Sequence, residues 1–232
     1  MYKEISRLII YGDMDEDSIL SRMADIFRKF DVEDTGKEEL TREIYTQIKR
    51  ILKVATDYGF DKNLWQNYLT FILITTENPF SITCEKVGAN DGSVNTFAMN
   101  DFGIFRKLFH YDFSEIEKEL SINCFSLITN YKAIVKKELM YNRNVSEKVR
   151  TLSEKLAAAT TDEEFFDGVT TFYKDYGVGM FGLNKAFRIG NNPDASVKFM
   201  AINNMDKVML TDLVGYEIQK KKLVENTENF VQ

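Results

Sequence analysis

The sequence predicts a mainly α fold, a multi-helical domain with a small β-hairpin near its C-terminal edge. Only two prolines occur in 232 residues, so long helices can run without interruption. Up to residue 176, apolar residues recur mostly with the 3.6-residue period of an amphipathic helix. After residue 182 this period is lost, and two short apolar runs flank the turn-forming stretch Gly190-Asn191-Asn192-Pro193-Asp194.

Three helices are expected before residue 60. The first should cover residues 2–11, and the second should follow the acids Asp13 and Asp15, which suit the positive end of a helix dipole. Thr35 and Glu38 have the spacing of a capping box and should begin the third helix. The apolar faces of the second and third helices are Ile19, Leu20, Met23, Ile26, Phe27 and Phe30, then Leu40, Ile44, Ile48, Ile51, Leu52 and Ala55.

A fourth helix should begin with Asp61 as its cap and run through the apolar residues 64–73. It should stop at Asn78-Pro79, because the residue before a proline avoids the helical region. Residues 80–100 change character, since Asn90-Asp91-Gly92-Ser93 is a turn signal between two short apolar runs. A small hairpin and an irregular loop are both open for this stretch.

Helical periodicity resumes near residues 101–110, and Ser114 with Glu117 suggests another helix start. Residues 120–141 should form a broken helix, and residues 145–158 a regular one.

The last predicted helix of the domain has signals at both ends. Thr161 and Glu164 form a capping box at its start, and Gly177 is placed to end it. Beyond it, residues 185–189 and 197–202 should pair as the hairpin, and residues 203–206 should be a linker.

Composition excludes several classes of protein. A formal net charge of −6 disfavours nonspecific nucleic-acid binding, which needs clustered Lys and Arg. No stretch reaches the roughly 18 apolar residues of a membrane span, and the acidic N-terminal segment is unlike a signal peptide. Cys84 and Cys124 are expected to be reduced, buried fillers. We therefore expect a cytoplasmic protein without membrane or nucleic-acid partners.

Two sequences imitate ligand-binding motifs. Gly177-Val178-Gly179-Met180-Phe181-Gly182 spells G-x-G-x-x-G, but a helix precedes it where a dinucleotide site needs a strand. We favour a helix end and a close backbone approach for these glycines. The stretch from Asp31 to Gly36 imitates a calcium loop, but Arg42 stands where the loop needs a bidentate Glu.

His110 is the only histidine, and no sequence signal brings a nucleophile to it. We predict no catalytic residue and no metal ligand in this chain.

The C-terminal segment carries a family resemblance. Its residues are Asp212-Leu213-Val214-Gly215-Tyr216, Gln219-Lys220, Leu223, Glu225-Asn226-Thr227 and Phe230. They resemble the stretch just ahead of the P-loop in an uncharacterised family of bacterial AAA+ ATPases. Upstream, Tyr176-Gly177-Val178-Gly179, Phe181-Gly182 and Lys185-Ala186-Phe187-Arg188 also resemble the N-terminal region of that family.

The resemblance implies a division of the chain. Residues 1–202 would be a helical N-terminal accessory domain, and residues 203–232 would be a linker and the first helix of a truncated ATPase domain. Val214 and Gly215 would line the edge of the adenine pocket once that domain is present. ATP and Mg²⁺ are implied for the full-length protein and not for this chain, in which the G-x-x-x-x-G-K-[ST] loop does not occur.

The function expected from this resemblance is non-catalytic recruitment of a protein partner or substrate, or regulation of the motor. Homo-oligomers would form through the ATPase domain. Two alternatives are open: an independent α-helical interaction scaffold without any ATPase link, and a small enzyme that uses the glycines of residues 177–182.

Overall fold

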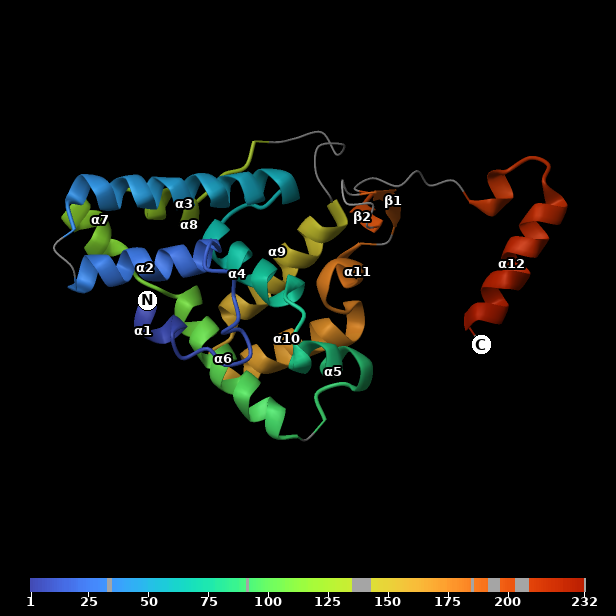
Figure 1. Ribbon diagram of the computed structural model, residues 1–232, viewed down its shortest axis with the longest axis horizontal. Coiled ribbons are helices and arrows are strands. Elements are labelled where there is room, and N and C mark those ends of the chain that lie inside the picture. The colour runs from blue at the N-terminus through green and yellow to red at the C-terminus, as the bar shows by residue number, and fades with distance from the viewer. Residues whose placement is uncertain are drawn as a thin grey trace.

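The computed structural model describes residues 1–32, 35–90, 92–134, 143–184, 186–191, 197–202 and 209–231. The helices up to residue 129 are α1 (Tyr2–Ile5), α2 (Ile19–Val32), α3 (Lys37–Tyr58), α4 (Leu64–Thr75), α5 (Pro79–Val87), α6 (Ser93–Phe109), α7 (Ser114–Leu120) and α8 (Cys124–Thr129). The later elements are α9 (Arg143–Ala158), α10 (Asp162–Tyr176), α11 (Gly179–Leu183), β1 (Phe187–Asn191), β2 (Val197–Ala201), the 3₁₀ turn η2 (Leu210–Asp212) and α12 (Glu217–Val231). The predicted mainly α class with one small hairpin is confirmed (Figure 1).

Helix α4 lies at the centre of the helical body (Figure 1). It is apolar around most of its circumference, and most of its side chains are buried. It packs against α3 and α8 as well as against α9 and α11, so helices from both halves of the chain cover it. A helix that is apolar all round must be enclosed in this way.

The polar side chains of α4 bond outward to the surrounding helices. The Trp65 indole N–H donates to the Leu108 carbonyl at 2.8 Å. The Asn67 amide donates to the Ser153 hydroxyl at 3.1 Å, and the Tyr68 hydroxyl accepts the Leu20 N–H at 3.1 Å. Burial therefore leaves these groups with partners, which is the condition for a polar atom in a core.

The predicted helix over residues 2–11 is wrong beyond Ile5. The Asp101 carboxylate, fully buried on α6, accepts the backbone N–H groups of Ile9, Ile10 and Tyr11 at 2.7 to 3.0 Å. These N–H groups point at a carboxylate from a distant helix and so do not continue the helical pattern of α1. A charged acceptor of this kind stabilises the bend more than a neutral one would.

Residues 80–87 and 93–100 are helical, so the hairpin and the irregular loop that were open for this stretch are both wrong. Helix α4 ends at Thr75, ahead of the predicted stop at Asn78-Pro79, and Pro79 is the first residue of α5. Asn78 accepts the Ser81 N–H at 2.8 Å, and the Ser81 hydroxyl accepts the Asn78 N–H at 2.9 Å. This reciprocal cap starts a new helix at the place where the sequence also allowed a hairpin strand. Helix α6 then begins at Ser93, earlier than the periodicity near residue 101 indicates.

Two predicted helix caps are also wrong. Helix α3 has Gly36 at its N-cap, and no side chain of the Thr35–Glu38 pair caps it. Helix α4 is capped by Asn63, which accepts the Gln66 N–H, while Asp61 accepts the N–H of Ala133 at 2.8 Å. Asp61 therefore anchors the chain that follows α8.

The helices predicted after residue 110 are mostly confirmed. Helix α7 begins at Ser114 as predicted, although Asp112 accepts the Ser114 N–H and Glu117 bonds Ser126. The broken helix predicted for residues 120–141 contains α8, and its part from 135 onward lies outside the described residues. Helix α9 confirms the helix at 145–158.

Helix α10 confirms Thr161 as its N-cap and Gly177 as its end, but the predicted capping box is only half formed, because the Glu164 carboxylate accepts the Thr160 N–H. Thr161 accepts the Glu164 N–H at 3.1 Å, and Gly177 ends the helix with φ at 78°. The hairpin is confirmed as antiparallel, with Ile189 opposite Phe199; its turn at 192–196 and the linker at 203–206 lie outside the described residues.

Both cysteines are free and buried, as predicted. Burial raises the pKa of the Cys84 thiol and raises that of Cys124 to about 11, so both stay protonated at neutral pH. Within the described residues, no helix combines the length and the apolar character needed to cross a bilayer.

Asp101→Asn should destabilise the protein by about 2–4 kcal/mol, because the amide keeps one acceptor oxygen and turns a donor toward backbone N–H groups. Urea unfolding followed by circular dichroism measures this change. Asp167→Asn, an exposed position on α10, is the matched control and should leave the midpoint unchanged. Equal midpoints for the two variants would contradict the role given to Asp101.

Candidate functional site

The exposed apolar side chains concentrate in the last quarter of the chain. Before residue 176, the large apolar side chains that remain exposed are scattered over separate helices. From residue 176 onward they are frequent, and we call the following set the C-terminal apolar surface: Tyr176, Met180, Phe181, Ile189, Val197, Phe199, Met200, Met209, Leu210, Leu213, Val214, Tyr216, Ile218, Leu223, Val224 and Phe230. Apolar exposure at this density is typical of a surface that packs against another domain or protein.

The hairpin and α11 contribute an aromatic cluster to this surface. The ring centroid of Phe181 lies 5.0 Å from that of Phe187 and 5.5 Å from that of Phe199. Alternation along the strands places Phe187, Ile189 and Phe199 on one face of the hairpin. Phe181 and Phe199 are 61% and 42% exposed, so the three rings cover one another only in part.

The three glycines of residues 177–182 hold α11 against the body. Gly177 and Gly179 have φ of 78° and 73°, a region that favours glycine. A Cβ on Gly182 would lie 2.5 Å from the Gly177 carbonyl carbon, so the two backbones touch. The predicted helix end and close approach are therefore confirmed.

Side chains of the helical body form hydrogen bonds with the backbone of this segment. The Glu85 carboxylate accepts the Val178 N–H at 3.2 Å, and the Lys148 ammonium donates to the Gly182 carbonyl at 3.0 Å. Glu77 lies against Gly179 in the same loop. Two carboxylates thus border the glycines where a dinucleotide would place its pyrophosphate. Helix α10 precedes the motif instead of a strand, so neither the geometry nor the charge suits a dinucleotide site.

Val214 and Gly215, the residues predicted to edge an adenine pocket, lie between η2 and α12. Val214 is 93% exposed. Gly215 has φ of 83°, and a Cβ added there would meet no atom within 4 Å. Tyr216 also adopts a positive φ of 59°. The chain therefore turns sharply into α12, with both predicted residues facing open space.

Helix α12 stands apart from the helical body in Figure 1. Its described side chains are exposed apart from Lys220, which forms an ion pair with Glu217 at 2.9 Å. The face of α12 that carries Leu223, Thr227 and Phe230 has no covering element among the residues that the structure describes. A 15-residue helix without packing is marginally stable, so this face needs a partner.

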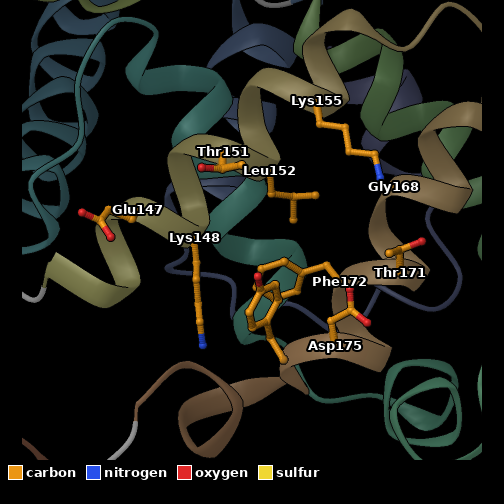
Figure 2. Close-up of a pocket in the computed structure, with 10 residues that line it drawn as sticks. Glu147, Lys148, Thr151, Leu152, Lys155, Gly168, Thr171, Phe172 and Asp175 are labelled. Atoms are coloured by element: carbon orange, nitrogen blue, oxygen red, sulfur yellow. The ribbon is translucent and has the colours of Figure 1, made fainter.

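A second feature is a groove between α9 and α10, shown in Figure 2. It encloses about 360 Å³ of free space, which is within the range of small-molecule sites. Leu152 and Phe172 form its apolar floor, and Lys148, Lys155 and Asp175 stand at its rim. Sequence reasoning did not find this groove, because it depends on two helices lying side by side.

The other candidates from the sequence are His110 and the calcium-loop imitation that begins at Asp31. His110 is exposed at the end of α6, and Arg42 lies within α3, as expected for a calcium-loop imitation. The described part of the chain has no cluster of three or more His, Cys, Asp or Glu side chains that could hold a metal ion.

Tyr11 and Tyr173 form a buried polar pair, with their hydroxyls hydrogen-bonded to each other. Tyr173 also donates to the Leu73 carbonyl at 2.7 Å. Burial raises the pKa of both phenols, so they stay protonated and serve to bridge the N-terminal segment, α4 and α10.

Comparison of the chain with models of known protein families, with curated proteins and with solved structures found no match.

Gly182→Ala should lower the free energy of unfolding by about 1–3 kcal/mol, because the new methyl group would overlap backbone atoms of Tyr176 and Gly177 that cannot move independently. Thermal or urea unfolding measures the loss. Gly36→Ala is the control, since a Cβ there would meet nothing within 4 Å. A Gly182 variant as stable as the Gly36 variant would show that the close approach is not required.

Proposed function

We propose that the chain is the non-catalytic N-terminal accessory domain of an AAA+ ATPase, together with the segment that leads into the ATPase module. The observation that carries this proposal is the C-terminal apolar surface. The body up to residue 175 buries its core, whereas the segment that resembles the ATPase family leaves most of its large apolar side chains uncovered. A module that covered them would supply the missing apolar contacts.

The local geometry of the lead-in segment supports this proposal. Asp212 accepts the Met209 N–H at 2.7 Å and fixes the turn η2 just before Leu213. The positive φ values at Gly215 and Tyr216 then reverse the chain into α12. Val214 and Gly215 thus present an aliphatic side chain and bare backbone on the outside of a tight turn. Such a surface can form one edge of a flat apolar pocket for an adenine ring, with the other edge supplied by the module.

ATP and Mg²⁺ would bind the module. A P-loop supplies the Lys that contacts the phosphates and the hydroxyl that contacts Mg²⁺. In this proposal the chain's own residues contribute only the adenine edge at Val214 and Gly215. The accessory domain would recruit a protein partner or substrate, or pass a conformational signal through residues 203–215. We place the protein in the cytoplasm, since both thiols are free and buried.

The alternative function is an independent α-helical interaction scaffold. The same apolar surface favours it, because a separate partner protein could cover Phe181, Phe199 and Phe230 equally well. The two functions differ in what the gene encodes next. A G-x-x-x-x-G-K-[ST] sequence within a few tens of codons after Gln232 supports the accessory domain, and its absence there supports the scaffold.

Hydrogen–deuterium exchange tests whether the module covers α12. In the 232-residue chain, the amides of residues 217–231 should exchange rapidly, because α12 lacks packing. In a protein that also carries the P-loop module, they should exchange at least about tenfold more slowly. The double variant Val214→Asp and Phe230→Asp should remove this protection. The module would cover both positions, and a carboxylate buried there without a partner would prevent the packing.

Leu127→Asp is the control for that experiment. Leu127 is 61% exposed on α8, outside the C-terminal apolar surface, so its variant should keep the protection. Equal exchange of α12 with and without the module would contradict the proposed packing.

The purified 232-residue chain should not hydrolyse ATP, because it contains neither the P-loop Lys nor the Ser or Thr that follows it. A phosphate-release assay with Mg²⁺ and ATP measures this. Turnover that a substitution within the 232 residues abolishes would refute the proposed role and favour an enzyme.

A further inference from the structure

We propose that the groove between α9 and α10 binds a small ligand with an aromatic body and one anionic group. This site lies outside the lead-in segment, so it does not depend on the proposed link to an ATPase. The groove is open to solvent, and its free space of about 360 Å³ suits a molecule built around a single ring.

The floor and one wall of the groove are apolar. Leu152 and Phe172 are buried side chains whose surfaces face the groove (Figure 2). The Tyr176 ring lies 5.0 Å from the Phe172 ring between centroids, and it is 50% exposed. An aromatic ligand can therefore stack on one ring while its edge contacts an aliphatic side chain, an arrangement that stabilises ring pairs beyond simple burial.

Gly168 brings the two helices close enough to form this floor. A Cβ at Gly168 would lie 2.8 Å from Leu156 Cδ2 and 3.8 Å from Lys155 Cε. The lack of a side chain on α10 thus gives room for the stem of Lys155, which crosses from α9 toward Gly168 in Figure 2. The Lys155 ammonium is in this way carried to the rim of the groove beside α10.

The two lysines at the rim have different roles. The Lys148 ammonium donates to the Gly182 carbonyl and lies 4.6 Å from the centroid of the Tyr176 ring, so it holds the aromatic wall in place. The Lys155 ammonium has no hydrogen bond or ion pair with any described residue. Lys155 is therefore the cation that can take the anionic group of a ligand.

The neighbouring polar groups fix the direction of the ligand. Thr171 follows Gly168 by one turn on α10, so its hydroxyl can donate to the same anion. Asp175 lies a further turn toward the C-terminus of α10, away from the Lys155 side chain, and Glu147 is directed away from the floor (Figure 2). The anion should lie at the Lys155 end, because the carboxylates would repel it at the other.

Phenyl phosphate and benzoate are the probes, since each joins one ring to one anionic group. Isothermal titration of the full chain should give saturable binding of at least one of them. Inorganic phosphate and phenol, which carry only half of this chemistry, should bind at least about tenfold more weakly. Chemical-shift changes of the methyl groups should centre on Leu152.

Variants identify the groups involved. Lys155→Met keeps the stem across Gly168 and removes the charge, so it should weaken the binding at least about tenfold. Thr171→Val removes one donor and should weaken it about threefold. Both positions are exposed, so the thermal midpoint should not change. Lys53→Met, at an exposed position on α3, is the control and should bind as the wild type does.

Three results would overturn the proposal: no saturable binding of either probe, equal affinity of the Lys155→Met and Lys53→Met variants, or inorganic phosphate binding as tightly as phenyl phosphate. None of them bears on the accessory-domain proposal, which depends on the sequence after Gln232 and on the protection of α12.

Discussion

The enclosure of α4 is the constraint on which the rest of the fold depends. A helix with Leu64, Leu69, Leu73 and Ile74 all nearly inaccessible to water cannot be covered by one neighbour. Helices from before and after it in the chain must therefore assemble around it. The few polar side chains of α4 determine the positions of these neighbours. Each of their hydrogen bonds fixes one residue of a neighbouring helix at one point along α4.

The segments far from α4 are positioned by buried polar contacts of longer range. Asp101 binds three consecutive N–H groups of the N-terminal segment, and the Tyr11–Tyr173 pair joins that segment to α10. Each contact joins residues at least 90 positions apart. Buried polar groups of this kind tolerate few alternative arrangements, because every displacement leaves a donor or acceptor without a partner. The N-terminal segment is thus held by specific hydrogen bonds more than by helix propensity.

This difference explains what the sequence could and could not predict. Both ends of α10 follow from local chemistry, since Thr161 and Gly177 act on backbone groups within four residues of themselves. Residues 6–11 could not be placed in this way, because the carboxylate that redirects them belongs to α6. Pro79 was ambiguous for a related reason: a proline can follow the end of one helix or begin another, and only the Asn78–Ser81 cap shows that it begins α5. The α9–α10 groove could not be predicted from the sequence. The need for a glycine at position 168 arises from the contact with Leu156 on another helix.

The groove and the C-terminal apolar surface are connected through one element. Tyr176 closes the aromatic wall of the groove and ends α10, and Gly177 next to it begins the loop into α11. Lys148 contacts both the Tyr176 ring and the Gly182 carbonyl, so the same ammonium borders the groove and holds α11. The aromatic cluster of the hairpin is packed on Phe181 of that short helix. Direct contacts therefore connect Tyr176, in the wall of the groove, with the hairpin in the surface proposed to meet the ATPase module.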